Sequence, residues 1–205
     1  MTKYFFAAWL GIAPLLSVAQ SSADVNALVA LLEQFEHAQG SFSQRQFGQD
    51  KILLAESSGE FRVFRPSYFA WEVLSPDEQL IIVGPEFIWH YDRDLETVTR
   101  RPVTGDAEMV PLKILGGDAE KLQEKFAIVR RSEDAFVLTP LSESVGFKQL
   151  ILYVDQTQLS GMEIQDNLDQ FVEIKFTNLD ADVELSSADF AFTPLPGADL
   201  FYYDQ

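Results

Sequence analysis

The first regular hydrophobic pattern lies in residues 24–40, where apolar residues recur every three or four positions. One stripe of a helix with this spacing carries the apolar residues Val25, Leu28, Leu32 and Phe35. Asp24 is of a residue type that caps the start of helices, and Gly40 is of the type that ends them. The pattern therefore predicts one amphipathic helix that begins near Asp24 and ends near Gly40.

After this segment apolar and polar residues alternate, which is typical of strands. Strands are predicted at 41–47, 58–65, 68–74, 78–84, 86–92 and 95–101. Turn-forming residues such as Ser75-Pro76-Asp77 and Gly84-Pro85 separate them. Because most of these connections are short, we expect antiparallel hairpins rather than crossover units.

The segment 101–126 interrupts this alternation with prolines and glycines around short apolar pieces. It predicts a loop with one short helix near Met109 to Leu115 and another near Ala119 to Lys125. Strands are then predicted at 126–131, 135–140, 147–155, 159–166, 170–180 and 190–194. The apolar tail 200–203 is compatible either with a final strand or with a latch over the sheet edge.

The predicted strands form the framework of an α+β domain with one large antiparallel sheet. Residues 61–74 and 147–154 are apolar on both faces, and strict alternation places Phe147, Ile151 and Tyr153 together. A sheet of this size coils rather than staying flat, so we expect a barrel or half-barrel covered by the N-terminal helix and residues 105–125. These covers carry few apolar residues, which favours an incompletely filled interior that holds a hydrophobic ligand.

The N-terminus has the pattern of a secretory signal peptide. Lys3 precedes an apolar run from Tyr4 to Leu16, which is short for a membrane span. Small residues then provide two cleavage positions, after Ala19 or after Ala23. We expect residues 1–23 to be a signal peptide and residues 24–205 to form a single exported domain.

Composition narrows the classes of partner and of chemistry. The 15 basic and 32 acidic residues give a formal net charge of −17, which disfavours nucleic acid and anionic lipid headgroups as partners. The chain has no cysteine, which excludes disulfides, thiol catalysis and thiolate metal sites. No other cofactor or metal site is expected.

Two acidic groups are candidates for an enzyme site. Asp92, Asp94 and Glu96 follow His90, and Asp180, Asp182 and Glu184 form a second group. Paired carboxylates bind Ca²⁺ or act as acid and base. Both groups lie beside predicted turns, where acidic residues are ordinary turn formers, and the chain contains no serine-nucleophile motif. The sequence therefore does not predict an enzyme.

Arg65 lies at an unusual position in the alternation. An extended chain places Phe61, Val63, Arg65, Phe69 and Trp71 on one face, if the turn at Pro66 preserves the register. A permanent cation among aromatic side chains is costly unless it donates hydrogen bonds. Some group must therefore accept hydrogen bonds from Arg65, and the residues alone leave open whether this is an acidic neighbour, solvent or another part of the chain.

These features together resemble a known family. The matching motifs are S-F-S-Q at 41–44, G-x-F-x-V-x-R-P-x-x-F-x-W from Gly59 to Trp71, I-W-H-Y-D-x-D-L-E from Ile88 to Glu96, F-V-L-T-P at 136–140 and F-x-F-T-P-x-P-G-A-D at 190–199. With the export signal and the first helix, they resemble the periplasmic outer-membrane lipoprotein carrier family, LolA. The block from Arg65 to Trp71 is the most specific part.

The resemblance implies an unclosed antiparallel β-barrel with a lid of short helices over a hydrophobic cavity. It implies a monomeric periplasmic chaperone that takes acylated lipoproteins from an inner-membrane LolCDE-type complex and passes them to an outer-membrane LolB-type receptor. It also implies that Arg65 holds the lid shut, through hydrogen bonds to backbone carbonyls of the 105–125 segment, and that Phe69 contacts cargo. The residues that we expect in the cavity are Phe61, Val63, Phe69, Trp71, Trp89, Leu112, Leu115 and Ile151. An exported lipid-binding or sensing domain of the same fold is the alternative.

Overall fold

The computed structural model describes residues 22–103, 114–115, 118–119, 121–142 and 146–203. Its helical elements are α1 (Ser22–Glu33), α3 (Leu122–Lys125) and the 3₁₀ turn η1 (Ser187–Phe190). Its strands are β1 (His37–Phe47), β2 (Leu53–Phe64), β3 (Tyr68–Ser75), β4 (Gln79–Val83), β5 (Phe87–Asp92), β6 (Thr97–Pro102), β7 (Phe126–Ser132), β8 (Ala135–Pro140), β9 (Phe147–Asp155), β10 (Gln158–Asp166), β11 (Phe171–Asp180) and β12 (Asp199–Tyr202).

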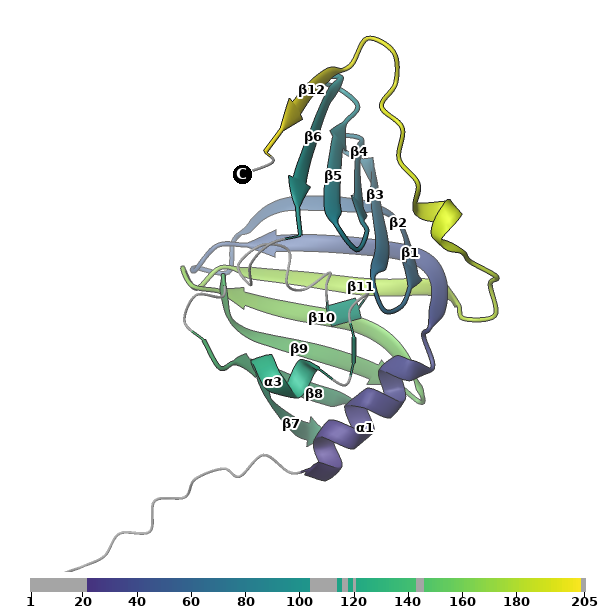
Figure 1. Cartoon of the computed structure of the whole chain (residues 1–205). Coiled ribbons are helices and arrows are strands. Elements are labelled where there is room, and N and C mark those ends of the chain that lie inside the picture. Colours follow the sequence, from purple (N-terminus) through teal and green to yellow (C-terminus); the bar gives the residue numbers. More distant parts are fainter. Residues whose placement is uncertain (1–21, 104–113, 116–117, 120, 143–145, 204–205) are drawn as a thin grey trace, which may run out of the picture.

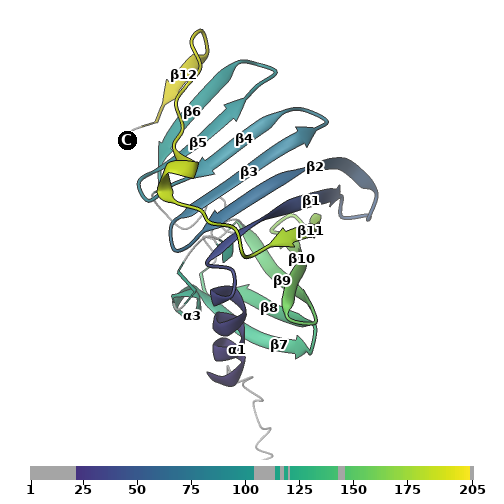
Figure 2. The same ribbon diagram turned by 90° about the vertical axis from the view of Figure 1, so that its right-hand side faces the viewer.

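All described strands belong to one sheet, in the order β12-β6-β5-β4-β3-β2-β1-β11-β10-β9-β8-β7. Strands that are consecutive in sequence from β1 to β6 and from β7 to β11 pair in antiparallel fashion. The antiparallel pair β1 and β11 joins the two halves. The sheet curves strongly and does not close, since β12 and β7 end it (Figures 1 and 2). The expected unclosed, highly curved antiparallel sheet with few helices is confirmed.

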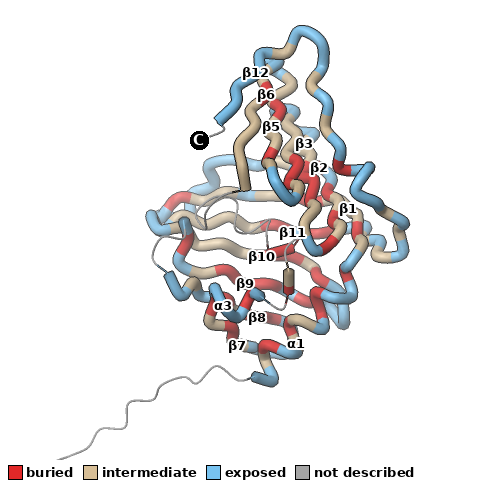
Figure 3. Tube along the Cα trace, in the orientation of Figure 1, coloured by how far each residue is buried: buried red, intermediate tan, exposed pale blue. Residues whose placement is uncertain are grey.

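The concave face of the sheet carries the main hydrophobic core. Side chains from α1, from α3 and from the helical residues Ile114 and Leu115 pack with the inward residues of β1–β5 and β7–β11. Figures 1 and 2 show α1 lying beside β7, and Figure 3 shows the buried positions concentrated along the strands. The helices therefore cover this face, as the sequence predicted. Within the described residues, no helix combines the length and the hydrophobicity that crossing a bilayer requires.

The N-terminal helix is shorter than predicted. It ends at Glu33, and Gly40 lies inside β1 instead of ending the helix. A Cβ atom at Gly40 would lie 3.0 Å from both the Phe61 ring and the Thr177 carbonyl oxygen, so this glycine is required for close strand packing. Asp24 lies within the first turn, and its Oδ2 accepts the backbone N–H of Arg130 in β7 at 3.0 Å. Asp24 therefore ties the helix to the sheet.

The C-terminal segment also differs from its prediction. Residues 190–194 are not a strand, although Phe190 and Phe192 do alternate with small polar and apolar residues. They belong to residues 181–198, which we call the strap, and which cross the convex face between β11 and β12 (Figures 1 and 2). The tail forms the final strand β12, which pairs in parallel with β6. Of the two predicted short helices, α3 confirms the second, whereas residues 109–113 of the first lie outside the described part.

Candidate functional site

The candidate site is the concave face of β2 and β3 together with the segment that covers it. Strand pairing places Phe61 opposite Trp71 and Val63 opposite Phe69, so the turn at Pro66 preserves the predicted register. All four side chains are buried in the main core. The expectation that they share one face is therefore confirmed.

Further aromatic residues extend this surface across the sheet. The Phe42 ring of β1 stacks on Trp71, with ring centroids 3.6 Å apart, and the Phe176 ring of β11 lies 5.0 Å from that of Phe61. Sequence reasoning did not single out Phe42 or Phe176, although both lie in strands that it predicted. Alternation within each strand predicts which face each residue occupies. It does not predict that β1 and β11, which are far apart in sequence, are neighbours in the sheet.

Arg65 lies at the edge of this apolar surface, directly after β2. It is the only polar or charged residue that is buried within the described part of the chain, with 7% of its surface exposed. Its Nη2 donates a hydrogen bond of 2.7 Å to the backbone carbonyl of Ile114. The backbone N–H of Arg65 donates to the Glu36 carbonyl at 2.9 Å. The guanidinium thus bonds the covering segment, as the family resemblance implies, across a separation of 49 residues.

Burial has an electrostatic cost at this position. Removal from water lowers the pKa of Arg65 to about 10, and the carboxylates of Asp118 and Glu33 oppose this shift. Since one pKa unit corresponds to about 1.4 kcal/mol, the site disfavours the charged form by roughly 3 kcal/mol. A charge-assisted hydrogen bond contributes about 1.5–3 kcal/mol. The hydrogen bond to the Ile114 carbonyl therefore offsets part of the cost of burying the cation, and breaking this bond leaves that cost less compensated.

The segment that covers this surface, which we call the cover, also contributes buried apolar residues to the core. Ile114 and Leu115 are almost completely buried, and Leu122 of α3 and Phe126 at the start of β7 pack in the same cluster. Leu115 therefore lies at the expected position between cover and sheet. Leu112, also expected there, lies outside the described residues.

Trp89, which we expected in the cavity, lies on the opposite face of the sheet. Ile88 points into the concave core, so its neighbour Trp89 points to the convex side, where it packs with Phe192 of the strap at a centroid distance of 5.2 Å. Because β5 is apolar on both faces, alternation alone did not distinguish the two. Trp89 does not line the concave surface.

Ile151 is displaced by an irregularity in β9. Gln149 pairs with Gln165 but Phe147 pairs with Asp166, so Lys148 is an extra residue in β9. Such a bulge shifts the alternation by one position. Phe147 therefore shares the concave core with Leu150 and Leu152, while Ile151, although buried, is not part of it.

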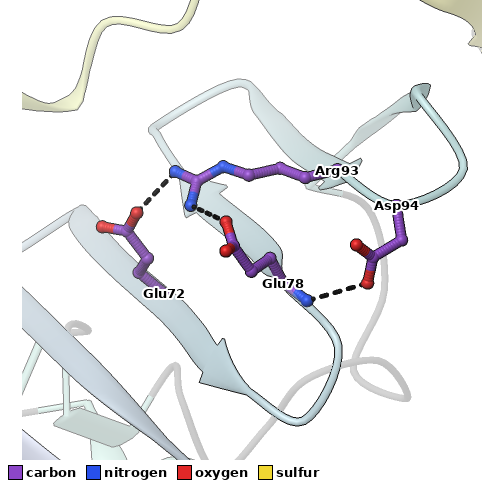
Figure 4. Close-up of polar contacts among 4 residues, drawn as sticks. All are labelled: Glu72, Glu78, Arg93 and Asp94. Atoms are coloured by element: carbon purple, nitrogen blue, oxygen red, sulfur yellow. Dashed lines mark hydrogen bonds and ion pairs between the residues drawn. The ribbon is translucent and has the colours of Figure 1, made fainter.

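The two acidic groups that were candidates for an enzyme site form hydrogen bonds within turns. Asp94 Oδ2 accepts the backbone N–H of Glu78 at 3.1 Å, and Arg93 bridges the carboxylates of Glu72 and Glu78 (Figure 4). Asp180 Oδ1 likewise accepts the N–H of Asp182 at 3.0 Å. Within the described residues, no three His, Asp or Glu side chains are arranged to hold a metal ion.

Comparison with known proteins gives consistent results along almost the whole chain. Residues 33–193 match the family model of the outer membrane lipoprotein carrier protein LolA. An outer-membrane lipoprotein carrier protein of Coxiella burnetii (strain CbuK_Q154) is 35% identical over 187 residues, covering 89% of this chain and 88% of the relative. The corresponding protein of Pseudomonas paraeruginosa is 30% identical over 203 residues, covering 98% of both chains.

Solved structures share the fold at low sequence identity. MucB superimposes with a TM-score of 0.51 at 14% identity, over 88% of this chain and 66% of that chain. A DUF1329 family protein from Desulfovibrio piger ATCC 29098 gives a TM-score of 0.50 at 12% identity, over 84% of this chain and 97% of that chain. With a family match that spans most of its length, the chain belongs to the outer membrane lipoprotein carrier protein LolA family.

Proposed function

We propose that lipoprotein acyl chains bind between the concave face and its cover, and that Arg65 closes this cover when no cargo is bound. As a LolA family member, the chain is a non-enzymatic carrier of outer membrane lipoproteins. It works in the periplasm, where it receives acylated lipoproteins from a LolCDE-type complex and delivers them to a LolB-type receptor. The hydrogen bond from Arg65 to the Ile114 carbonyl carries the proposal.

The energetics of the cargo explain why a carrier is needed. Exposure of three acyl chains of ~16 carbons to water costs roughly 35 kcal/mol, at about 0.8 kcal/mol per methylene. Non-covalent affinities reach a limit near ~20 kcal/mol. The carrier therefore shelters the chains only in part, and this partial shelter keeps release possible.

The position of Arg65 gives the loaded state a reason to release cargo. Acyl chains that enter the core must displace Ile114 and Leu115, which are buried against the sheet. This displacement breaks the bond from Arg65 to Ile114 and leaves a cation beside an apolar surface. Delivery of the cargo lets the cover return and restores the bond. Cargo uptake and release are therefore coupled through one side chain.

The direct test combines a cargo assay with the substitution Arg65→Leu. The purified mature protein is mixed with a triacylated lipoprotein, and soluble complexes are separated by size-exclusion chromatography. Transfer is then measured with liposomes that carry a LolB-type receptor. We expect Arg65→Leu to form the complex but to deliver little of it, because leucine removes the penalty of the loaded state.

Arg62→Leu is the matched control. Arg62 lies in the same strand, but alternation turns it to the convex side, where its guanidinium lies 5.9 Å from the centre of the Phe190 ring. This variant should bind and deliver cargo normally. Normal delivery by Arg65→Leu would refute the latch, and binding of free lipid without any lipoprotein complex would favour a lipid-sensing domain instead.

A further inference from the structure

The two edges of the sheet differ in how they are protected. At the β7 edge, the N–H of Arg130 is bound by Asp24 of α1, and Arg130, Arg131 and Ser132 are exposed polar residues. At the other edge, β12 has β6 as its only neighbour in the described sheet, and all four of its residues are exposed (Figure 3). Proteins commonly protect such edges with lysine, proline or a covering element. None of these occurs within β12.

The backbone of β12 presents to its outer side hydrogen-bonding groups that pair with no other strand of the described sheet. Asp199 N–H donates to the Glu96 carbonyl and Tyr203 N–H to the Arg100 carbonyl, both at 2.9 Å. In a parallel pair, alternate residues bond the same neighbour. The N–H and C=O groups of Leu200 and Tyr202 therefore point away from β6. They form a template to which another strand can add.

The side chains of β12 suit a protein partner. Leu200, Phe201 and Tyr202 are 42%, 50% and 50% exposed. Aromatic residues are enriched in protein interfaces because they bury a large area with little loss of conformational freedom. The Tyr202 ring is held by Arg100, whose guanidinium lies 4.5 Å from its centre. It is therefore already fixed in place before a partner binds.

The charge at the start of β12 selects the kind of partner. Its first residue, Asp199, pairs with Thr97, which follows the acidic turn that contains Asp92, Asp94 and Glu96. The whole chain has a formal net charge of −17, so a second copy is repelled at this edge. A basic segment is attracted.

We propose that β12 is a docking strand to which an extended segment of a partner protein adds, with apolar residues that alternate with lysine or arginine. The added strand bonds the outward groups of Leu200 and Tyr202. Its apolar side chains pack on the exposed residues of β12, and its basic residues lie near the acidic turn. This surface is separate from the concave face and does not depend on cargo.

A synthetic peptide that alternates lysine and valine is the probe. We expect it to bind the full-length mature protein and to slow amide hydrogen exchange at Leu200 and Tyr202, while Phe201, which already faces β6, is unchanged. A peptide with glutamate in place of lysine should not bind. Failure of the lysine peptide to bind, or protection elsewhere only, would overturn the proposal.

Two substitutions at one position separate the backbone from the side chain. Tyr202→Pro removes the ring and the outward N–H, and proline is tolerated where an edge N–H faces solvent. Tyr202→Ala removes only the ring. Because one hydrogen bond is lost between them, Tyr202→Pro should bind the peptide about fivefold more weakly than Tyr202→Ala.

Equal affinities of the two variants would overturn strand addition. A dimer of the unmodified protein without peptide, abolished by Tyr202→Pro, would assign the edge to a second copy and also refute the proposal. Size-exclusion chromatography with light scattering measures this state. No lipoprotein enters these experiments, so their failure leaves the carrier proposal intact, and failure of the carrier proposal leaves this one standing.

Discussion

The concave and convex faces of the same sheet are both covered, but in different ways. The concave cover consists of helical segments, and a buried cation, Arg65, bonds it through a backbone carbonyl. The convex cover is the strap, which packs Phe190 and Phe192 on an aromatic surface that includes Tyr68 and Trp89. Within the described residues, no charged side chain is buried on the convex side.

From this difference we expect the concave cover to open and the strap to remain closed. Opening the concave cover breaks the hydrogen bond from Arg65 to the Ile114 carbonyl, and closing it restores that bond, so this cover has a contact that can switch. The strap is held instead by aromatic contacts, which are favourable only in the closed arrangement. In addition, the Ser186 hydroxyl and backbone N–H both donate to Asp189 at the start of η1. We therefore expect cargo to enter on the concave side only.

The largest expected effect comes from matched truncations on the two faces. Phe69 and Phe190 are 1% and 5% exposed, and each substitution to alanine should lower the free energy of unfolding by about 3–5 kcal/mol. Phe69→Ala should also weaken cargo binding, whereas Phe190→Ala should not. Chemical denaturation and the cargo assay measure these effects. Equal losses of cargo binding would mean that the two faces are not functionally distinct.

Gly40→Ala should have the next largest effect, because the added methyl group would meet the Phe61 ring and the Thr177 carbonyl oxygen at 3.0 Å. Such overpacking costs about 1–3 kcal/mol. Gly84→Ala is the control, since its Cβ would have no neighbour closer than 3.8 Å. Thermal unfolding distinguishes them, and a fully stable Gly40→Ala would show that the concave face is loosely packed here.

Arg65→Leu should change the free energy of unfolding by less than about 1 kcal/mol, because the substitution removes both the burial cost and the hydrogen bond. The same variant should lose delivery of cargo. Urea denaturation of the empty protein tests the first part. A large loss of stability would identify Arg65 as a structural residue rather than a latch.

The smallest expected effects are those of pH. Burial lowers the pKa of His90 below its ordinary value of 6.5, against the opposing charge of Asp92. The unfolded chain therefore takes up a proton first as the pH falls, and stability declines from pH 6.5 down to the folded pKa. Replacement of His90 by glutamine should flatten this decline in unfolding measurements. An unchanged pH profile would show that another group causes it.

The strap should respond only in stronger acid. Hydrogen bonds from the Ser186 backbone and hydroxyl lower the pKa of Asp189 below its ordinary 3.8. Its contribution is therefore present above pH 3.8 and is lost as the pH falls through the lower folded pKa. Amide exchange around η1 should accelerate in that range but not near pH 6. Faster amide exchange around η1 already near pH 6 would contradict the difference that we infer between the two covers.

The sequence by itself determined the alternation of the strands, the antiparallel hairpins and the shared face of Phe61, Val63, Phe69 and Trp71, because these depend on local spacing and short turns. Where a strand is apolar on both faces, the sequence does not show which face points inward, and the expected side of Trp89 was therefore wrong. The expected side of Ile151 was wrong because the bulge at Lys148 shifts the alternation. Residues 190–194 alternate like a strand, but they lie in the strap and pair with no strand in the described part of the chain.

Only the tertiary structure decided what Arg65 binds and where β12 lies. A backbone carbonyl accepts a hydrogen bond whatever its side chain, so nothing in the sequence marks Ile114 as the partner of Arg65. The pairing of β12 with β6 likewise joins segments far apart in the chain. Local patterns fix which residues form strands, whereas contacts between distant backbone groups depend on how the whole sheet curves.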